Sequence, residues 1–445
     1  MWQEDIADSS FLYLQCLDTA GVLLGSNLKL DSKTYRLLPA ICTVASSGYA
    51  AVWMEIGESS NGWDVYGQLF DVNGDSMAPA FKANDNSLAE RYCPDIASDS
   101  QGNYTVVWMD SRGGWKIYGQ KYSAAGSPVG GNIILGDSAG CDPKICMKPD
   151  GSFAITWQTE TDNILWRRFD SSGNPTSPSL RLNARNVGLA YAQPVIAVND
   201  SGSYGIAWTR ATSSGVAVLA QFCDSSGTPI GNNVAVNEDT LIWGGHPTVV
   251  PSAGNRFVVG WTDERDWVDN YCQRFYDCNK LEGNNVKLSS AMATGERYRQ
   301  SLTLAASGND LFAVWMDLRD TSSSWDIYAR KTSYQELGVE GYPVQLNKPG
   351  KPELNTAAYP NPSRVQITIR YSLQGITGSV PASLEIYNIC GQKINGINLG
   401  LKNSGTHSLK LGDIGINSRP VSAGIYFYRL TAGTLVGKGK FVVLK

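Results

Sequence analysis

Tryptophan, aspartate and arginine recur in a W-x-D-x-R pattern that offers the clearest material for chemistry. It occurs three times, at Trp108-Asp110-Arg112, Trp261-Asp263-Arg265 and Trp315-Asp317-Arg319. Such carboxylates could bind a cation or form part of a sugar site, whereas Asp and Arg two residues apart at a strand end can also pair with each other. Because a catalytic residue should be singular and this pattern is repeated, we predict a structural role for it.

The sequence contains little other catalytic material. The two histidines, His246 and His407, are too few for a Ser-His-Asp triad or a histidine-based metal site. His246, just before a proline at a strand entrance, is predicted to be a loop residue. Acidic neighbours such as Asp263 and Glu264 could serve glycoside hydrolysis, but their spacing does not place them on either side of a cleft. We therefore predict no catalytic residue, no metal site and no cofactor.

The nine cysteines include no C-x-x-C pair of the kind found in zinc and redox sites. Cys141 with Cys146, and Cys272 with Cys278, are close enough in sequence for local disulfides in an oxidising compartment. We favour the alternative, in which the cysteines are free and act as small apolar residues.

The tryptophan of the W-x-D-x-R pattern belongs to a longer series with nearly constant spacing. Its members are Trp2, Trp53, Trp108, Trp157, Trp208, Trp261 and Trp315, separated by 51, 55, 49, 51, 53 and 54 residues. A fixed period of this length indicates a repeat architecture. Around Trp108, the alternation of apolar residues and turn residues predicts four short strands in about 50 residues, the pattern of a β-propeller blade.

Six such units are complete, from about residue 38 to residue 347, and an incomplete unit precedes them. Trp2 aligns with the end of a second strand, so the first blade lacks its opening strand. We predict an all-β propeller over residues 1–347 with seven blades, the first incomplete; a six-bladed ring in which residues 2–30 form an appendage is the alternative. The sequence begins without a signal peptide, so we expect a chain truncated at its N-terminus.

A second set of aromatic residues stands where the loop after the second strand returns into the third strand. These residues are Trp63, Trp115, Trp267 and Trp325. Facing outward, they would form stacking platforms for a glycan or a peptide; facing inward, they would pack between blades. We favour packing because a tyrosine recurs after them, and we keep the four as the candidate ligand-contacting residues.

Charge and hydropathy exclude two classes of partner. The net charge is −4 with 18% charged residues, and no basic patch is present that could neutralise nucleic-acid phosphates. Apolar runs stay short of the roughly 18 residues that a membrane span requires. We therefore expect no nucleic-acid binding and no membrane span.

The composition changes after residue 347. Residues 348–357 are rich in proline and predict a linker, and strands are expected at 365–373, 382–389, 407–411, 424–431 and 438–444, which suits a small immunoglobulin-like β-sandwich. The segments YPNPSRVQITIRYSL, SLEIYNICGQKI, GTHSLKL, SAGIYFYRLTAG and GKGKFVVLK follow one another over residues 358–445. This succession resembles the type A C-terminal sorting domain of type IX secretion system cargo in Bacteroidota, and it is similar to the immunoglobulin-like domain of flagellar hook-capping proteins. Ser363 departs from the family, which commonly has an aromatic residue there.

The resemblance implies export across the outer membrane by the type IX machinery, followed by release or attachment at the cell surface. Our first hypothesis is a secreted or surface-displayed binding scaffold whose propeller binds a glycan or a protein. A carbohydrate-active enzyme, hydrolase or lyase, with carboxylates in the propeller funnel is the second. A structural component of a surface layer or an adhesion system is the third.

Overall fold

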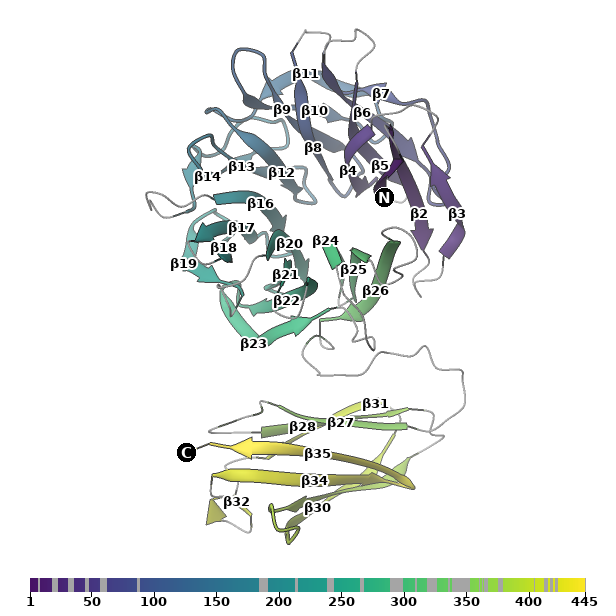
Figure 1. Ribbon diagram of the computed structural model, residues 1–445, viewed down its shortest axis with the longest axis vertical. Coiled ribbons are helices and arrows are strands. Elements are labelled where there is room, and N and C mark those ends of the chain that lie inside the picture. The colour runs from purple at the N-terminus through teal and green to yellow at the C-terminus, as the bar shows by residue number, and fades with distance from the viewer. Residues whose placement is uncertain are drawn as a thin grey trace. The chain divides into compact units, whose positions relative to one another are not determined.

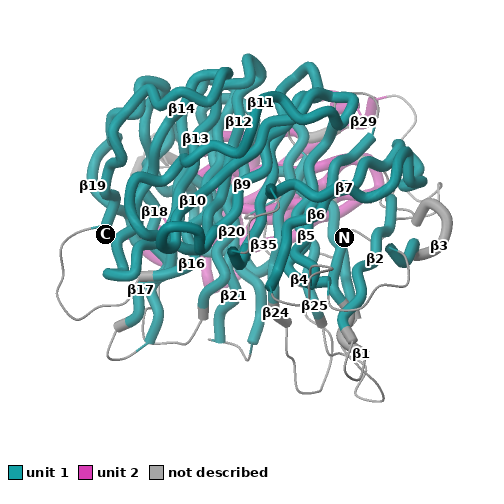
Figure 2. Tube along the Cα trace, turned by 90° about the horizontal axis from the view of Figure 1, so that it is seen from above, with its two compact units in different colours: residues 1–338 teal, residues 339–445 magenta. Residues whose placement is uncertain are grey.

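The computed structural model of the chain describes most of its 445 residues. The described residues are 1–6, 9–17, 23–30, 36–44, 48–56, 62–85, 89–183, 191–212, 215–237, 244–264, 268–288, 299–308, 310–317, 326–334, 337, 353–359, 361, 363, 367–374, 379–403, 405–411, 415–416, 419–420 and 423–444. The chain divides into two compact units, Met1–Gly338 and Val339–Lys445 (Figure 2).

Within its described part, the first unit consists of seven antiparallel sheets of consecutive strands. The first sheet holds β1 (Trp2–Ile6), β2 (Ser9–Leu17) and β3 (Leu23–Lys29). The second holds β4 (Arg36–Thr43), β5 (Tyr49–Ile56), β6 (Trp63–Phe70) and β7 (Phe81–Lys82). The third holds β8 (Arg91–Ser98), β9 (Tyr104–Asp110), β10 (Lys116–Tyr122) and β11 (Pro128–Ile134). The fourth holds β12 (Cys141–Met147), β13 (Phe153–Gln158), β14 (Ile164–Phe169) and β15 (Leu180–Arg181).

The remaining three sheets of this unit continue the same order. The fifth holds β16 (Tyr191–Val198), β17 (Tyr204–Thr212), β18 (Gly215–Cys223) and β19 (Pro229–Ala235). The sixth holds β20 (Gly244–Ser252), β21 (Arg256–Asp263), β22 (Asp269–Tyr276) and β23 (Lys280–Lys287). The seventh holds β24 (Arg299–Ser307), β25 (Asp310–Asp317) and β26 (Asp326–Ser333).

The seven sheets are fanned around one axis (Figure 1). The opening strands β4, β8, β12, β16, β20 and β24 contact one another in sequence and form the inner wall of the ring. The first sheet has three described strands and packs against the second sheet, in the same way as each later sheet packs against the next one. The predicted seven-bladed propeller is therefore confirmed, and the residues proposed as an appendage in the six-bladed alternative form a blade.

The recurring tryptophans are buried between consecutive sheets. Trp53, Trp108, Trp157 and Trp208 have no exposed surface, and Trp261 and Trp315 have 1% and 5%. Each of these six side chains packs in one apolar cluster with side chains of the preceding sheet. The recurring tryptophans thus join neighbouring blades at these six positions. Trp2 is half-buried and stacks on Tyr13 with ring centroids 5.6 Å apart.

One type of turn recurs in the hairpins between third and fourth strands, which lie at the rim opposite the start of the inner strands. In the fifth blade, Asp224 Oδ1 accepts the backbone N–H groups of Ser226 and Thr228, both at 2.9 Å. Gly227 closes this turn with φ of 86°, a conformation that glycine adopts without steric cost. In the second to fifth blades a left-handed glycine stands in the turn that joins the third strand to the fourth, whereas in the sixth blade Asp277 and Cys278 take the left-handed positions.

A side-chain clasp that the sequence analysis missed also joins the blades. Asn233 donates to Gln221 Oε1 at 2.7 Å and to the carbonyl of Leu182, in the preceding blade, at 3.2 Å. The same pair of contacts is made by Asn132 and by Asn285. Because the glutamine also caps backbone carbonyls of its own blade, each clasp ties three strands together.

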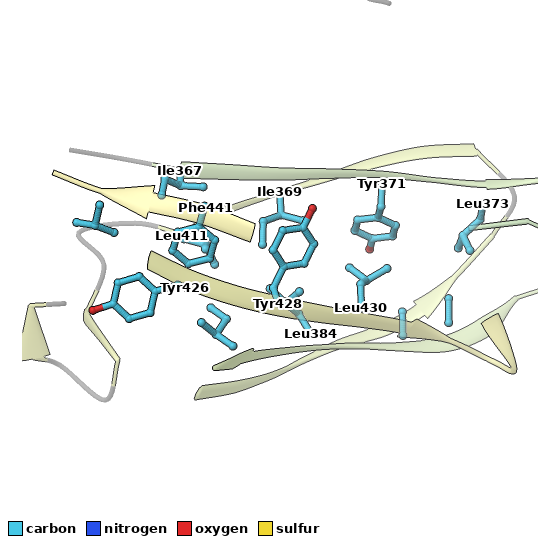
Figure 3. Close-up of a cluster of buried hydrophobic side chains, with 14 residues drawn as sticks. Ile367, Ile369, Tyr371, Leu373, Leu384, Leu411, Tyr426, Tyr428, Leu430 and Phe441 are labelled. Carbon is cyan, nitrogen blue, oxygen red and sulfur yellow. The ribbon is translucent and has the colours of Figure 1, made fainter. Parts of the chain in front are cut away.

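The second unit is a β-sandwich. One sheet has the order β27 (Glu353–Tyr359), β28 (Ile367–Gln374), β31 (Gly405–Leu411). The other has the order β30 (Lys393–Lys402), β29 (Val380–Tyr387), β34 (Gly424–Ala432), β35 (Leu435–Val443), and a short pair is formed by β32 (Gly415–Ile416) and β33 (Arg419–Pro420). Alternate side chains of the two sheets, among them Ile369, Leu384, Tyr428 and Leu430, fill the core between them (Figure 3).

The five strands predicted for this unit are present with shifts of a few residues, whereas β27, β30 and the short strands β32 and β33 were not anticipated. β27 occupies residues 353–357 of the predicted linker, where Leu354 packs on the core. Ser363 is buried at the position where the family has an aromatic residue. Its N–H donates to Val442 O at 3.0 Å and its carbonyl accepts the N–H of Leu444, so the backbone ties this segment to the last strand.

Replacing Trp208 with alanine should lower the free energy of unfolding by about 3–5 kcal/mol, because the change empties a fully buried site between two blades. Urea titration followed by tryptophan fluorescence and circular dichroism measures the loss. Trp208→Phe is the matched control: among the described residues the indole N–H has no hydrogen-bond partner, so the phenyl ring should retain most of the stability. A loss below about 1 kcal/mol for the alanine variant would contradict the packing role.

Candidate functional site

Each innermost strand begins with a β-bulge. The register shifts at the start of β4, β8, β12, β16, β20 and β24, and at each shift one residue adopts a left-handed conformation. These residues are Leu38, Cys93, Asp142, Gln193, His246 and Ser301, with φ between 48° and 55°. We call this set the bulge ring, since its members occupy equivalent places at the rim where the inner strands begin.

Backbone preference accounts for only part of the residue types in the bulge ring. A left-handed residue is cheapest as glycine; asparagine, aspartate and histidine are also enriched there, and other side chains cost of order 1–3 kcal/mol. None of the six is glycine, only Asp142 and His246 are of an enriched type, and no two are alike. Bulges re-aim side chains and are common beside active sites. The backbone conformation is thus repeated from blade to blade, whereas the side chain differs at each bulge. A binding or catalytic site built on a repeat requires this combination.

His246 is bound to its neighbour in the ring, Gln193. The backbone N–H of His246 donates to Gln193 Oε1 at 3.0 Å, and Gln193 Nε2 lies 3.1 Å from His246 Nδ1. Because Gln193 Oε1 accepts from the backbone of His246, the side-chain amide of Gln193 can only donate its N–H to the imidazole. Nδ1 of His246 is therefore the acceptor, and the neutral imidazole carries its proton on Nε2. The prediction that His246 is a loop residue is wrong, because it lies in β20 (Gly244–Ser252).

A second pair joins Cys93 to Asp142 of the next blade. Burial, reinforced by a hydrogen bond to Asp142 and by its charge, raises the pKa of the Cys93 thiol to about 12. The pKa of Cys141 is raised to about 11, mainly by burial. Both thiols therefore stay protonated at neutral pH and are poor nucleophiles. All nine cysteines are free, so the local disulfides considered from the sequence do not form.

Asp95 lies two residues beyond Cys93 on the same inner strand. Its Oδ2 accepts the N–H of Ile145 from the neighbouring inner strand at 2.9 Å. Burial raises the pKa of Asp95, and the positive charge of Lys144 opposes that shift in part. No other inner strand has a carboxylate at the residue that ends the register shift.

The carboxylate of the W-x-D-x-R pattern forms hydrogen bonds that stabilise the fold. Asp110 accepts from Trp108 Nε1 at 3.1 Å, from Arg112 at 3.0 and 2.6 Å, and from Arg91 at 3.3 Å. Burial alone would raise the pKa of Asp110, but the Arg112 and Trp108 hydrogen bonds outweigh it and lower that pKa. Asp263 likewise is buried and accepts from its tryptophan at 2.9 Å. These two copies are structural, as predicted; the side chain of Asp317 lies outside the described residues.

The predicted aromatic contacts divide in two. Trp267 and Trp325 lie outside the described residues. Trp63 and Trp115 are half-buried at the start of third strands, on the rim that carries the bulge ring. The Trp115 ring lies 5.6 Å from that of Tyr92, which directly precedes Cys93, and the Tyr92 hydroxyl donates to Glu90 Oε2 at 3.1 Å. Trp115 thereby adjoins the bulge ring, a neighbourhood that the sequence spacing did not indicate.

The part of the chain that the structure describes contains no group of three or more His, Cys, Asp or Glu side chains placed to hold a metal ion. It also contains no helix long and apolar enough to cross a membrane.

Residues 357–444 match the family described as the secretion system C-terminal sorting domain, and no curated protein matches the chain. Among solved structures the chain is similar to PorZ, a surface component of the type IX secretion system of Porphyromonas gingivalis, with 14% identity, a TM-score of 0.41, and coverage of 100% of this chain and 59% of that one. An α-L-arabinanase of Penicillium chrysogenum has 11% identity, a TM-score of 0.45 and coverage of 68% and 94%. A protein of unknown function from Dyadobacter fermentans has 10% identity, a TM-score of 0.42 and coverage of 74% and 96%.

Replacing Asp110 with alanine should lower the free energy of unfolding by about 3 kcal/mol, because the buried Arg91 and the Trp108 N–H lose an acceptor. Thermal and urea unfolding measure the effect. Lys280→Ala is the control, since it breaks a largely exposed ion pair with Asp277 and should cost less than about 1 kcal/mol. Equal losses for both variants would show that the buried carboxylate has no special structural role.

Proposed function

Since residues 357–444 form a type IX secretion system C-terminal sorting domain, the chain is a secreted or cell-surface protein, and we propose that its propeller binds a glycan or protein ligand at the bulge ring. In this proposal the sorting domain engages the secretion machinery, and the propeller acts outside the cell as a binding scaffold. The residues that contact the ligand are those of the bulge ring, together with Trp115 and Tyr92 beside it.

The observation that carries this proposal is the contrast between repeated geometry and unrepeated side chains. Structural features of this propeller recur with the same residue type, as the buried tryptophans and the Asn–Gln clasps do. The bulge ring instead has six different side chains at six equivalent positions with a left-handed backbone. Backbone strain that persists without a structural preference is a mark of a functional site.

One observation favours the enzyme as a second candidate. Asp95 and Asp142 come from neighbouring inner strands, and burial raises the pKa of Asp95. Two carboxyl groups in different environments are the usual equipment of glycoside hydrolysis, with the raised-pKa group as the acid. If the propeller is a hydrolase, reducing ends should accumulate from a bound polysaccharide, and Asp95→Asn should abolish their release while binding persists.

Placing a bulky side chain in the bulge ring should abolish ligand binding. We expect Ser301→Trp to lose every specific signal that the wild-type chain gives on glycan and protein arrays, because the indole covers the neighbouring ring residues. Ser172→Trp is the matched control: Ser172 is an exposed residue in a hairpin at the opposite rim of the propeller. Unchanged binding by the Ser301 variant would place the ligand elsewhere.

Deleting residues 353–445 should abolish export and leave the propeller folded. The deletion begins at the first residue of β27, so no strand of the sandwich remains. Fractionation of expressing cells with detection of the protein in the medium, on the surface and inside measures export, and circular dichroism of the purified truncated chain checks the propeller. Secretion at the level of the full chain would refute the sorting assignment.

A further inference from the structure

We infer that the ligand of the bulge ring is an uncharged oligosaccharide, held by the Nε2–H group of His246 and the carboxylate of Asp142. The inference rests on the proposed function and narrows it to one class of ligand and two anchoring groups. It follows from which hydrogen-bonding groups of the ring are already used and which remain.

His246 offers a single donor in a fixed orientation. Gln193 occupies Nδ1, and the carbonyl end of the same amide holds the backbone of His246, so the imidazole is clasped on one side. The side chain is exposed, and its remaining polar group is the Nε2–H. Gln193 therefore acts as a positioning residue, because it decides which nitrogen carries the proton.

Asp142 offers the complementary acceptor. It is half-buried, and the Cys93 thiol, which stays protonated because of its raised pKa, donates to it. A carboxylate has about four acceptor positions, so one weak S–H donor leaves most of them for a ligand. Ser301, exposed on the ring, adds a hydroxyl that can donate or accept. Separate single donors and acceptors around a rim suit a molecule whose surface is covered with hydroxyl groups.

The aromatic pair beside the ring supplies an apolar surface of the matching kind. Trp115 and Tyr92 are half-buried with rings tilted by 40°, and the bond from the Tyr92 hydroxyl to Glu90 fixes the tyrosine. The C–H faces of a sugar ring are apolar and can lie on such a surface while its hydroxyls reach polar groups. The aromatic pair and the two anchors would thus contact different edges of one oligosaccharide.

The charges on the ring argue against other ligands. Asp142 and the exposed Glu90 on this rim place two carboxylates against the ammonium group of Lys144, so a polyanion such as a uronate chain would meet net negative charge. Leu38, 49% exposed, is the one aliphatic member of the bulge ring, so an apolar peptide segment would find a single apolar contact there. Such a peptide would also leave the polar members of the bulge ring without hydrogen-bond partners. An uncharged polyol satisfies the donors and acceptors without either cost.

The test is isothermal titration calorimetry of the full chain with neutral hexasaccharides, namely β-1,4-linked xylose, glucose and mannose hexamers, and with an α-1,4-linked galacturonate hexamer. We expect binding of at least one neutral hexamer and none of the galacturonate. His246→Ala and Asp142→Ala should each weaken binding at least tenfold. His407→Ala, which changes the histidine of the sorting domain, should leave the Kd unchanged.

A readout without ligand keeps the inference testable if a variant does not fold. The ¹⁵N chemical shifts of the His246 side chain in the wild-type chain should report a protonated Nε2 and an unprotonated Nδ1. In Gln193→Glu the carboxylate cannot donate to Nδ1, so that nitrogen should gain a proton and its ¹⁵N shift should move to the range of a protonated nitrogen. A wild-type imidazole protonated on Nδ1 alone would overturn the anchoring scheme.

The outcomes separate this inference from the proposed function. Preference for galacturonate, no binding of any neutral hexamer, or binding that His246→Ala and Asp142→Ala leave unchanged would each overturn the inference. If Ser301→Trp nevertheless abolishes binding of another ligand on the arrays, the proposed binding function stands and the class of ligand is wrong. If Ser301→Trp changes nothing, both are wrong.

Discussion

The structure depends on one contact above all, the wedging of a tryptophan between consecutive sheets. A second strand such as β9 is apolar on both faces, so a single blade would leave one face in water. Burying about 200 Å² of indole contributes roughly 5 kcal/mol at ~25 cal/mol/Å². Six of these contacts are buried to 5% exposure or less, and the Asn–Gln clasps tie together three of the interfaces that the indoles keep dry. The blades are therefore stable as a ring and would not be stable singly.

This packing explains why the inner strands can carry strained residues. A left-handed Leu38 or Cys93 persists only when its surroundings determine the backbone, and each bulge lies between the second strand of its own blade and at least one neighbouring inner strand. The packing of the whole propeller then offsets the free-energy cost of the left-handed residues. Because the backbone geometry does not depend on the side chain at the bulge, that side chain is free to differ from blade to blade. The repeat supplies rigid positions, and in the proposed function the exceptions to the repeat supply recognition.

The sequence carries the signals for the fold much more plainly than those for the site. The tryptophan period predicts the propeller because burial between blades selects the same large side chain each time. The bulge ring has no common residue type, and a histidine just before a proline at a strand entrance shows no pattern of a site, so pattern analysis assigns His246 to a loop. One signal was nevertheless available: in five blades a proline stands 14 residues before the tryptophan, as Pro247 does before Trp261. The tie between Gln193 and His246 crosses 53 residues and has no local signature.

The W-x-D-x-R pattern shows why frequency is a poor guide to chemistry in a repeat protein. The buried Asp110 is stabilised by the indole N–H of Trp108 and by Arg91, so its negative charge is matched where it stands. Where the second residue after the tryptophan is not acidic, as after Trp157 and Trp208, the indole N–H has no partner among the described residues and packing alone holds the ring. The carboxylate thus serves the tryptophan and is added or omitted blade by blade. Asp142, the carboxylate that we propose binds the ligand, stands at a bulge position where the five other bulges carry different residues, so no repeated pattern marks it.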